Sequence, residues 1–217
     1  WGEALATCAG LVLDGRDDWR LPSRLELVSL VDPSRTPTLD ADAFPGTAPD
    51  YFWSASQAAF GDGFAWSLYF GQGITEWGRV DQPSAHARCV RGASPLRTAS
   101  YVVEPDTVRD VHTGLVWQRG TSELVAGDEA LATCRALALG GRNDWRLPSV
   151  QELQSLVDDG RFEPAIDAVA FPAAAGERFW SDAARPSEAI VRAVSFARGQ
   201  VLEAALAAHA RCVRTFR

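Results

Sequence analysis

The strongest constraint on the fold is a stretch that the chain contains twice. Residues 15–27 and 141–153 share the pattern Gly-Arg-(Asp/Asn)-Asp-Trp-Arg-Leu-Pro-Ser-x-x-Glu-Leu, at a constant offset of 126 positions (Trp145 minus Trp19). The same register already holds at Glu3 and Glu129. A register shared over so long a segment indicates an internal duplication. We therefore interpret the chain as two copies of one domain, called repeat 1 and repeat 2 below.

Length and composition allow each copy its own core. A chain of 217 residues, 47% of them hydrophobic, can bury two cores of about 100 residues each, which is a common domain size. We expect repeat 1 at residues 1–92, a linker at 93–100 and repeat 2 at 101–217. No apolar run approaches the roughly 20 residues that cross a bilayer, so we expect no transmembrane segment in this chain.

The four cysteines occur as one early and one late in each repeat: Cys8, Cys89, Cys134 and Cys212. Four cysteines allow three pairings. The duplication favours Cys8–Cys89 and Cys134–Cys212, because each repeat then closes itself. The spacing fits neither a zinc site nor a redox motif. Such disulfides would place the protein in an oxidising compartment; the alternative is four buried free thiols.

Each repeat is expected to contain two helices. Apolar residues at helical spacing predict the first helix over residues 1–13 in repeat 1 and 128–139 in repeat 2, with the cysteine on the apolar face. The second helix should begin after the Trp-Arg-Leu-Pro segment. There a serine is followed three positions later by glutamate, which is the capping-box pattern: Ser23 with Glu26, and Ser149 with Glu152. We expect the tryptophan of that segment to lie in the core and its arginine to hold a carboxylate or a carbonyl.

Short strands should follow each second helix. They are expected near residues 52–54 and 66–70 in repeat 1 and near 179–181 and 194–197 in repeat 2. Each repeat ends in His-Ala-Arg-Cys-Val-Arg, at 86–91 and 209–214, and the alternation predicts one strand with its cysteine facing inward.

Repeat 2 alone opens with a predicted hairpin, formed by residues 107–111 and 115–118. Repeat 1 contains no equivalent of this hairpin before Trp1. Either residues upstream of Trp1 or an unseen strand should complete the first sheet, because a bare sheet edge is a liability.

These blocks resemble the Legionella collagen-like protein C-terminal (Lcl_C) domain family. The blocks are Leu-x-Trp-Gln, Glu-Ala-Leu-x-x-Cys, Asp-Trp-Arg-Leu-Pro-Ser-x-x-Glu-Leu, Phe-Trp-Ser and Arg-Cys-Val-Arg. Repeat 2 contains all of them, at residues 115–118, 129–134, 144–153, 179–181 and 211–214. Repeat 1 contains all but the first, so the resemblance spans nearly the whole chain.

The resemblance implies an α+β chain of two tandem C-type-lectin-like domains. In each, two helices would pack on a small, twisted, mostly antiparallel sheet, and one disulfide would join the first helix to the last strand. It further implies adhesion or ligand binding at the cell surface, including binding of sulfated polysaccharide in the name-giving member. This chain differs from the name-giving member in its charge. At net charge −7 it lacks the basic surface that sulfated glycans select.

The two repeats diverge most between the Phe-Trp-Ser strand and the last strand. Repeat 1 is rich in aromatic and acidic residues there, whereas the aligned segment of repeat 2 is rich in Ala, Val and Leu. Aromatic rings and carboxylates suit a neutral sugar or a peptide, through stacking and hydrogen bonds. The candidate ligand-binding residues are therefore Asp62, Trp66, Tyr69, Gln72, Glu76, Trp77 and Arg79. The competing interpretation is that about half of these aromatics are core.

Other functional classes have weaker support. The chain has no cluster of Lys or Arg, which argues against a nucleic-acid partner. No catalytic triad, zinc cluster or phosphate loop is visible, so we expect no enzyme and no cofactor. Calcium remains a small possibility at Asp17, Asp18, Asn143 and Asp144 and at Asp40 and Asp42, although turn capping explains these residues more simply.

The sequence thus predicts a secreted or cell-surface module of bacterial type that binds a glycan or a surface protein without catalysis. The alternative is a structural or assembly module whose partners are other regions of a longer polypeptide or further copies of itself.

Overall fold

The computed structural model describes residues 1–82, 85–93, 100–174, 176–184, 191–202 and 207–216. The chain forms two compact units, Trp1–Leu96 and Arg97–Arg217, and each is described by itself. Most of the expected linker, at residues 94–99, lies outside the described residues. Both units are α+β, with short helices and mainly antiparallel sheets.

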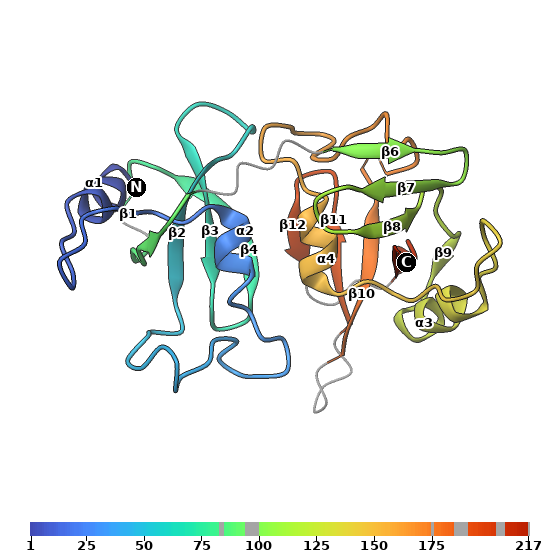
Figure 1. The fold of residues 1–217 in the computed structure, drawn as a ribbon, viewed down its shortest axis with the longest axis horizontal. Coiled ribbons are helices and arrows are strands. Elements are labelled where there is room, and N and C mark those ends of the chain that lie inside the picture. Colours follow the sequence, from blue (N-terminus) through green and yellow to red (C-terminus); the bar gives the residue numbers. More distant parts are fainter. Residues whose placement is uncertain (83–84, 94–99, 175, 185–190, 203–206, 217) are drawn as a thin grey trace. The chain divides into compact units, whose positions relative to one another are not determined.

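Unit 1 contains repeat 1. Its antiparallel sheet has the order β2-β3-β4, and a separate pair joins β1 to β5. The elements are α1 (Gly2–Ala9), β1 (Trp19–Arg20), α2 (Arg24–Val28), β2 (Tyr51–Gln57), β3 (Phe64–Tyr69), β4 (Ile74–Arg79) and β5 (Val90–Arg91). Helix α2 packs on β2 and β3, and α1 contacts β1 (Figure 1).

Unit 2 contains repeat 2, with a sheet of order β14-β8-β7-β6 and a second sheet of order β12-β11-β10-β13-β9. Helix α4 lies beside β10 and β11 (Figure 1). The elements are β6 (Tyr101–Val103), β7 (Thr107–Asp110), β8 (Leu115–Gln118), β9 (Leu124–Val125), α3 (Gly127–Ala136), α4 (Val150–Ser155), β10 (Arg178–Ala184), β11 (Val191–Ser195), β12 (Gln200–Leu202), β13 (Ala208–His209) and β14 (Val213–Thr215).

Both predicted disulfides are present. Cys8 bonds to Cys89 and Cys134 bonds to Cys212, each with a Cα–Cα distance of 5.3 Å. Each bond ties the first helix of its repeat to the segment that enters the last strand. Both expected capping boxes are present too: Ser23 and Ser149 accept a hydrogen bond from the backbone N–H of the glutamate three positions on.

The first helices are shorter than the sequence pattern predicts. Helix α1 ends at Ala9 and α3 ends at Ala136, so the predicted ends at residues 13 and 139 are wrong. The reason is a tight turn: the backbone groups of Leu13 and Arg16 exchange two hydrogen bonds of 3.0 Å, and the equivalent residues of repeat 2 do the same. That turn takes the backbone out of helical geometry and leaves Val12 68% exposed.

The last strand is also not one strand. In repeat 2, His209 pairs in parallel with Phe179 of β10, whereas Val213 pairs with Trp117 of β8 in the other sheet. In repeat 1, only Val90 and Arg91 form a strand. The His-Ala-Arg-Cys-Val-Arg segment therefore crosses between two sheets, and alternation along the chain does not reveal such a crossing.

Candidate functional site

The seven candidate residues do not form one site. Directly opposed residues of neighbouring strands share one face of a sheet, and neighbours along a strand alternate. Trp66 lies opposite Trp77, so both belong to the face on which α2 packs, whereas Ser67 lies opposite Glu76 on the other face. Tyr69 lies two residues after Ser67 on β3, so its side chain points to the same face as Ser67 and Glu76. Asp62 lies in the β2–β3 loop and Gln72 in the β3–β4 turn, outside the strands.

Trp66 belongs to the core, so its assignment as a ligand-binding residue is not tenable. Its side chain is 3% exposed, and the guanidinium carbon of the fully buried Arg24 lies 5.4 Å from the ring centroid. A ring covered in this way cannot stack on a ligand without opening the core. The competing interpretation of the aromatic segment is correct for this residue.

On the α2 face, Trp77 takes part in a group of three rings, called the aromatic cluster below. Phe60 stacks on Trp77 with 4.3 Å between centroids, and Phe64 meets both rings edge-on at 5.0 and 5.5 Å. Phe60 is 40% exposed. Arg79 is the last residue of β4, and its Nη2 atom lies 2.6 Å from Oδ2 of Asp81. Asp62 is exposed in the neighbouring loop. The cluster is thus apolar at its centre and charged at its margin.

On the opposite face, Tyr51 and Tyr69 form a second group with Glu76, called the tyrosine pair below. The two rings stack with 4.9 Å between centroids, and the Tyr51 hydroxyl donates to Glu76 Oε2 at 3.1 Å. Burial and the neighbouring Glu76 carboxylate raise the pKa of Tyr51 to about 12, so the phenol remains a proton donor at neutral pH. Tyr51 was missed by sequence reasoning, although it directly precedes the Phe-Trp-Ser motif and pairs with Tyr69 across the sheet.

Repeat 2 lacks the tyrosine pair. Its strands β10 and β11 align with β2 and β3, since Phe179 and Val194 lie opposite each other as Phe52 and Leu68 do. At the positions of Tyr51, Tyr69 and Glu76 repeat 2 has Arg178, Ser195 and Leu202. The position that aligns with Trp77 is residue 203, which lies outside the described residues. Two equal ligand sites are therefore not present in the described part of the chain.

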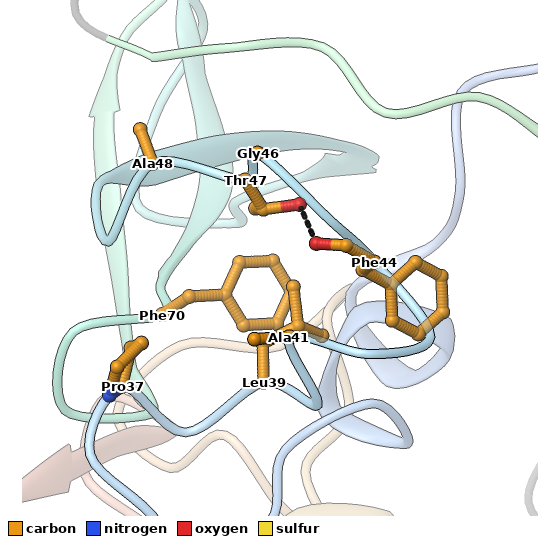
Figure 2. A pocket seen from close by; sticks show the side chains of 8 residues that line it. All are labelled: Pro37, Leu39, Ala41, Phe44, Gly46, Thr47, Ala48 and Phe70. Carbon is orange, nitrogen blue, oxygen red and sulfur yellow. Dashed lines mark hydrogen bonds between the residues drawn. The ribbon is translucent and has the colours of Figure 1, made fainter.

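Two hollows are lined entirely by described residues of repeat 1. The smaller, about 50 Å³, lies under the loop before β2 and is lined by Pro37, Leu39, Ala41, Phe44, Gly46, Thr47, Ala48 and Phe70 (Figure 2). Thr47 donates to the Phe44 carbonyl at 2.9 Å there and accepts a hydrogen bond from Arg88. The volume of this smaller hollow is close to that of one or two water molecules and is far below the size of a sugar pocket.

The larger hollow, about 320 Å³, is called the edge groove below. It is lined by Trp1, Glu3, Ala4, Asp50, Trp53, Ala85 and His86. The Nε2 atom of His86 lies 3.5 Å from a carboxylate oxygen of Asp50. Both side chains are about half exposed, whereas Trp53 at the base of the groove is only 2% exposed.

The duplicated Trp-Arg-Leu-Pro segment has a structural role in both repeats. Arg20 and Arg146 each donate two hydrogen bonds of 2.6 and 2.8 Å to the glutamate of the capping box. The expectation that these arginines hold a carboxylate is confirmed. Trp145 is 3% exposed and lies in the core as expected, whereas Trp19 is only half-buried.

Two of the acidic residues considered for calcium have other contacts. Asp18 binds Arg91 at 2.7 Å, and Asp40 Oδ1 accepts from the N–H groups of Asp42 and Ala43. In the part of the chain that the structure describes, no group of three or more His, Cys, Asp or Glu side chains is placed to hold a metal ion. Within the same residues, no helix is long and apolar enough to cross a membrane.

The comparison with known families agrees with the duplication. The sequence profile of the Lcl C-terminal domain matches residues 1–91 and again residues 106–214. The chain therefore belongs to the Lcl C-terminal domain family and contains two tandem copies of that domain. No curated protein matches it.

Proposed function

We propose that this chain is a non-catalytic recognition module that acts in an oxidising, extracellular or cell-surface setting and binds its ligand through repeat 1. The ligand is a glycan or a surface protein. The same proposal includes a C-type-lectin-like fold for each repeat. The two disulfides support the setting, because such bonds persist outside the reducing cytosol.

One observation carries the proposal: repeat 1 presents aromatic and acidic side chains on its three-stranded sheet, and repeat 2 replaces the tyrosine pair. The stacked tyrosine rings provide a flat surface, and Glu76 provides an acceptor beside them. This is the combination that binds the apolar face and the hydroxyl groups of a neutral sugar. On the other face, the exposed Phe60 next to charged residues is typical of a protein-binding hot spot.

The experiment is a glycan array probed with the chain, once with calcium and once with chelator, and repeated with three variants. Tyr69→Ala should abolish sugar binding with a melting temperature close to wild type. Phe60→Ala should leave sugar binding intact, because the aromatic cluster lies on the other face. Phe162→Ala, which removes a half-buried ring of repeat 2, is the matched control and should bind normally.

Equal binding by Tyr69→Ala and wild type would contradict the sugar site. A silent array would move the ligand class to proteins, with Phe60→Ala and Trp77→Ala as the variants that should then lose binding. Binding that disappears in chelator would mean that a calcium ion takes part.

A further inference from the structure

The tyrosine pair has a negative charge that stacking on a neutral sugar does not use. The Glu76 carboxylate lies beside the two rings, and the carboxylate of Asp50 is close enough to help raise the pKa of the Tyr51 phenol. We infer that the glycan bound by repeat 1 is a polymer of amino sugars whose amino groups are free and protonated. This inference rests on the proposed function and narrows its ligand class.

Glu76 is the carboxylate available to an ammonium group. Its side chain is exposed, and its Oε2 atom accepts the Tyr51 hydroxyl at 3.1 Å. Because that phenol stays protonated at neutral pH, the carboxylate keeps its negative charge. Among the described residues, no arginine or histidine forms an ion pair with Glu76: Arg79 of the same strand belongs to the other face of the sheet. The carboxylate of Asp50, in contrast, lies 3.5 Å from His86 in the edge groove.

The two tyrosine rings are positioned for a ligand. Their centroids lie 4.9 Å apart with 29° between the planes, and both side chains are half-buried, so part of each ring faces solvent. In the β3–β4 turn, a Cβ added at Gly71 would overlap the Tyr69 ring, so this glycine makes room for the ring. Aromatic faces attract a cation placed over them, and they also pack against apolar surface. A sugar that carries an ammonium group can make both contacts while Glu76 binds the ammonium.

Repeat 2 has the opposite electrostatics at the aligned positions. Arg178 stands at the position of Tyr51 and Leu202 at that of Glu76, so a guanidinium group replaces the phenol and the carboxylate is lost. The turn position that is glycine in repeat 1 is Ala197 in repeat 2, which has no tyrosine ring to accommodate. The acidic and aromatic surface is therefore not a requirement of the fold, because repeat 2 folds without it.

The charge of the site also selects among ligands. Sulfated and other acidic polymers are repelled by Glu76 and by the net charge of −7. A hexosamine with a free amino group offers the same apolar ring face and hydroxyl groups as a neutral sugar and adds a positive charge. A charge-assisted hydrogen bond is about twice as strong as a neutral one. A lysine side chain would supply the charge without the sugar ring and would leave most of the tyrosine surface uncovered.

The test is isothermal titration calorimetry of the whole chain with two hexamers of equal length, one of glucosamine and one of N-acetylglucosamine. At a pH of about 6 the first carries protonated amino groups, and the second is its uncharged match. Wild type should bind the glucosamine hexamer about tenfold more tightly, because a hydrogen bond to a charged group contributes more than one between neutral groups.

Three variants locate the selectivity. Glu76→Gln keeps an acceptor for the Tyr51 hydroxyl but removes the charge, so the two hexamers should then bind with equal affinity. Tyr51→Arg places the residue of repeat 2 in repeat 1 and should abolish binding of the glucosamine hexamer. Asp62→Asn makes the same change in net charge in an exposed loop outside the strands. It is the matched control and should keep the preference of about tenfold.

Equal binding of the two hexamers by wild type overturns the inference but leaves the proposed function in place, since a glycan is still bound. A preference that persists in Glu76→Gln also overturns it, because the selecting charge then lies elsewhere. Loss of the preference in Asp62→Asn as well does the same, because net charge alone would then explain it. If neither hexamer binds, the inference fails, and the glycan array decides the proposed function independently.

Discussion

At the residue scale, the buried arginine beneath the main sheet comes from a different element in each repeat. In repeat 1 it is Arg24 of α2, which lies under Trp66 of β3. In repeat 2 the helix position is Val150, and the strand position that aligns with Trp66 is Arg192, 1% exposed. At this pair of aligned positions each repeat therefore has one buried arginine, on the helix in repeat 1 and on the strand in repeat 2. A buried charge is costly to place, so the two positions should depend on one another.

This dependence gives the first prediction. Trp66→Arg alone places a second guanidinium beside Arg24 and removes a ring, so it should destabilise repeat 1 by about 3–5 kcal/mol. Adding Arg24→Val recreates the combination of repeat 2 and should recover part of that loss. Denaturant unfolding of the two single variants and the double variant measures the coupling energy. Additive losses would show that the two sites are independent.

At the element scale, the second helix of each repeat starts at a three-residue clamp of arginine, serine and glutamate. Two hydrogen bonds from Arg20 lower the pKa of Glu26 below its ordinary value of 4.5, and the bond from the Ser23 N–H adds to this. For Glu152, burial pushes the pKa upward, but hydrogen bonds from Arg146 and Ser149 outweigh it and the pKa is lowered. Both carboxylates are therefore favoured in the charged form.

The second prediction follows from these lowered pKa values. A carboxylate whose pKa is lower in the folded state contributes its stabilisation above its unfolded pKa, and this is lost as the pH falls through the folded pKa. The melting temperature should fall as the pH drops below about 4. Glu152→Gln should lower the melting temperature of repeat 2 at pH 7 and flatten its decline in acid.

Asp17→Asn, an exposed change in the preceding turn of repeat 1, serves as the control and should leave the pH profile intact. An acid profile that is the same in Glu152→Gln and wild type would mean that other carboxylates govern the transition.

The elements that could be predicted are those whose signals are local. Ser23 with Glu26 defines a helix start within four residues, and the hairpin of β7 and β8 is marked by alternation on both sides of a turn. The ends of α1 and α3 could not be predicted, because the turn at Leu13 depends on backbone hydrogen bonds rather than on apolar spacing.

The arrangement of the candidate residues could be predicted only in part, and for a similar reason. Sequence reasoning placed the residues of one segment of repeat 1 on one surface, and ligand binding by that segment stays a prediction. The pairing register of β3 and β4 puts Trp77 and Glu76 on opposite faces, and it buries Trp66 under α2. Register and helix packing are long-range properties, so no spacing within the segment reveals them.

At the scale of the whole molecule, each repeat is closed by its own disulfide, and no disulfide crosses between the two units. The two bonded cysteines are 81 residues apart in sequence in repeat 1 and 78 residues apart in repeat 2. Loops of this length should each contribute about 4 kcal/mol of stability in the chain-entropy picture.

The third prediction is that the two bonds act separately. Cys134→Ser together with Cys212→Ser should lower the unfolding transition of repeat 2 by the equivalent of about 4 kcal/mol and leave that of repeat 1 in place. The pair Cys8→Ser and Cys89→Ser is the matched counterpart and should do the reverse. Scanning calorimetry measures both transitions, and a shift of both by either pair would mean that the repeats unfold as one unit.

The position of the disulfides also decides how a repeat would respond to mechanical load. The Cα atoms of Cys134 and Cys212 lie 5.3 Å apart and are joined through the disulfide. A pulling force on the two ends of repeat 2 is therefore carried by this covalent bond, and the chain between the two cysteines, 78 residues apart in sequence, cannot extend. The hairpin of β7 and β8, with β9 after it, precedes Cys134 and lies outside that loop. Under tension these strands would be peeled off first while the rest stays folded.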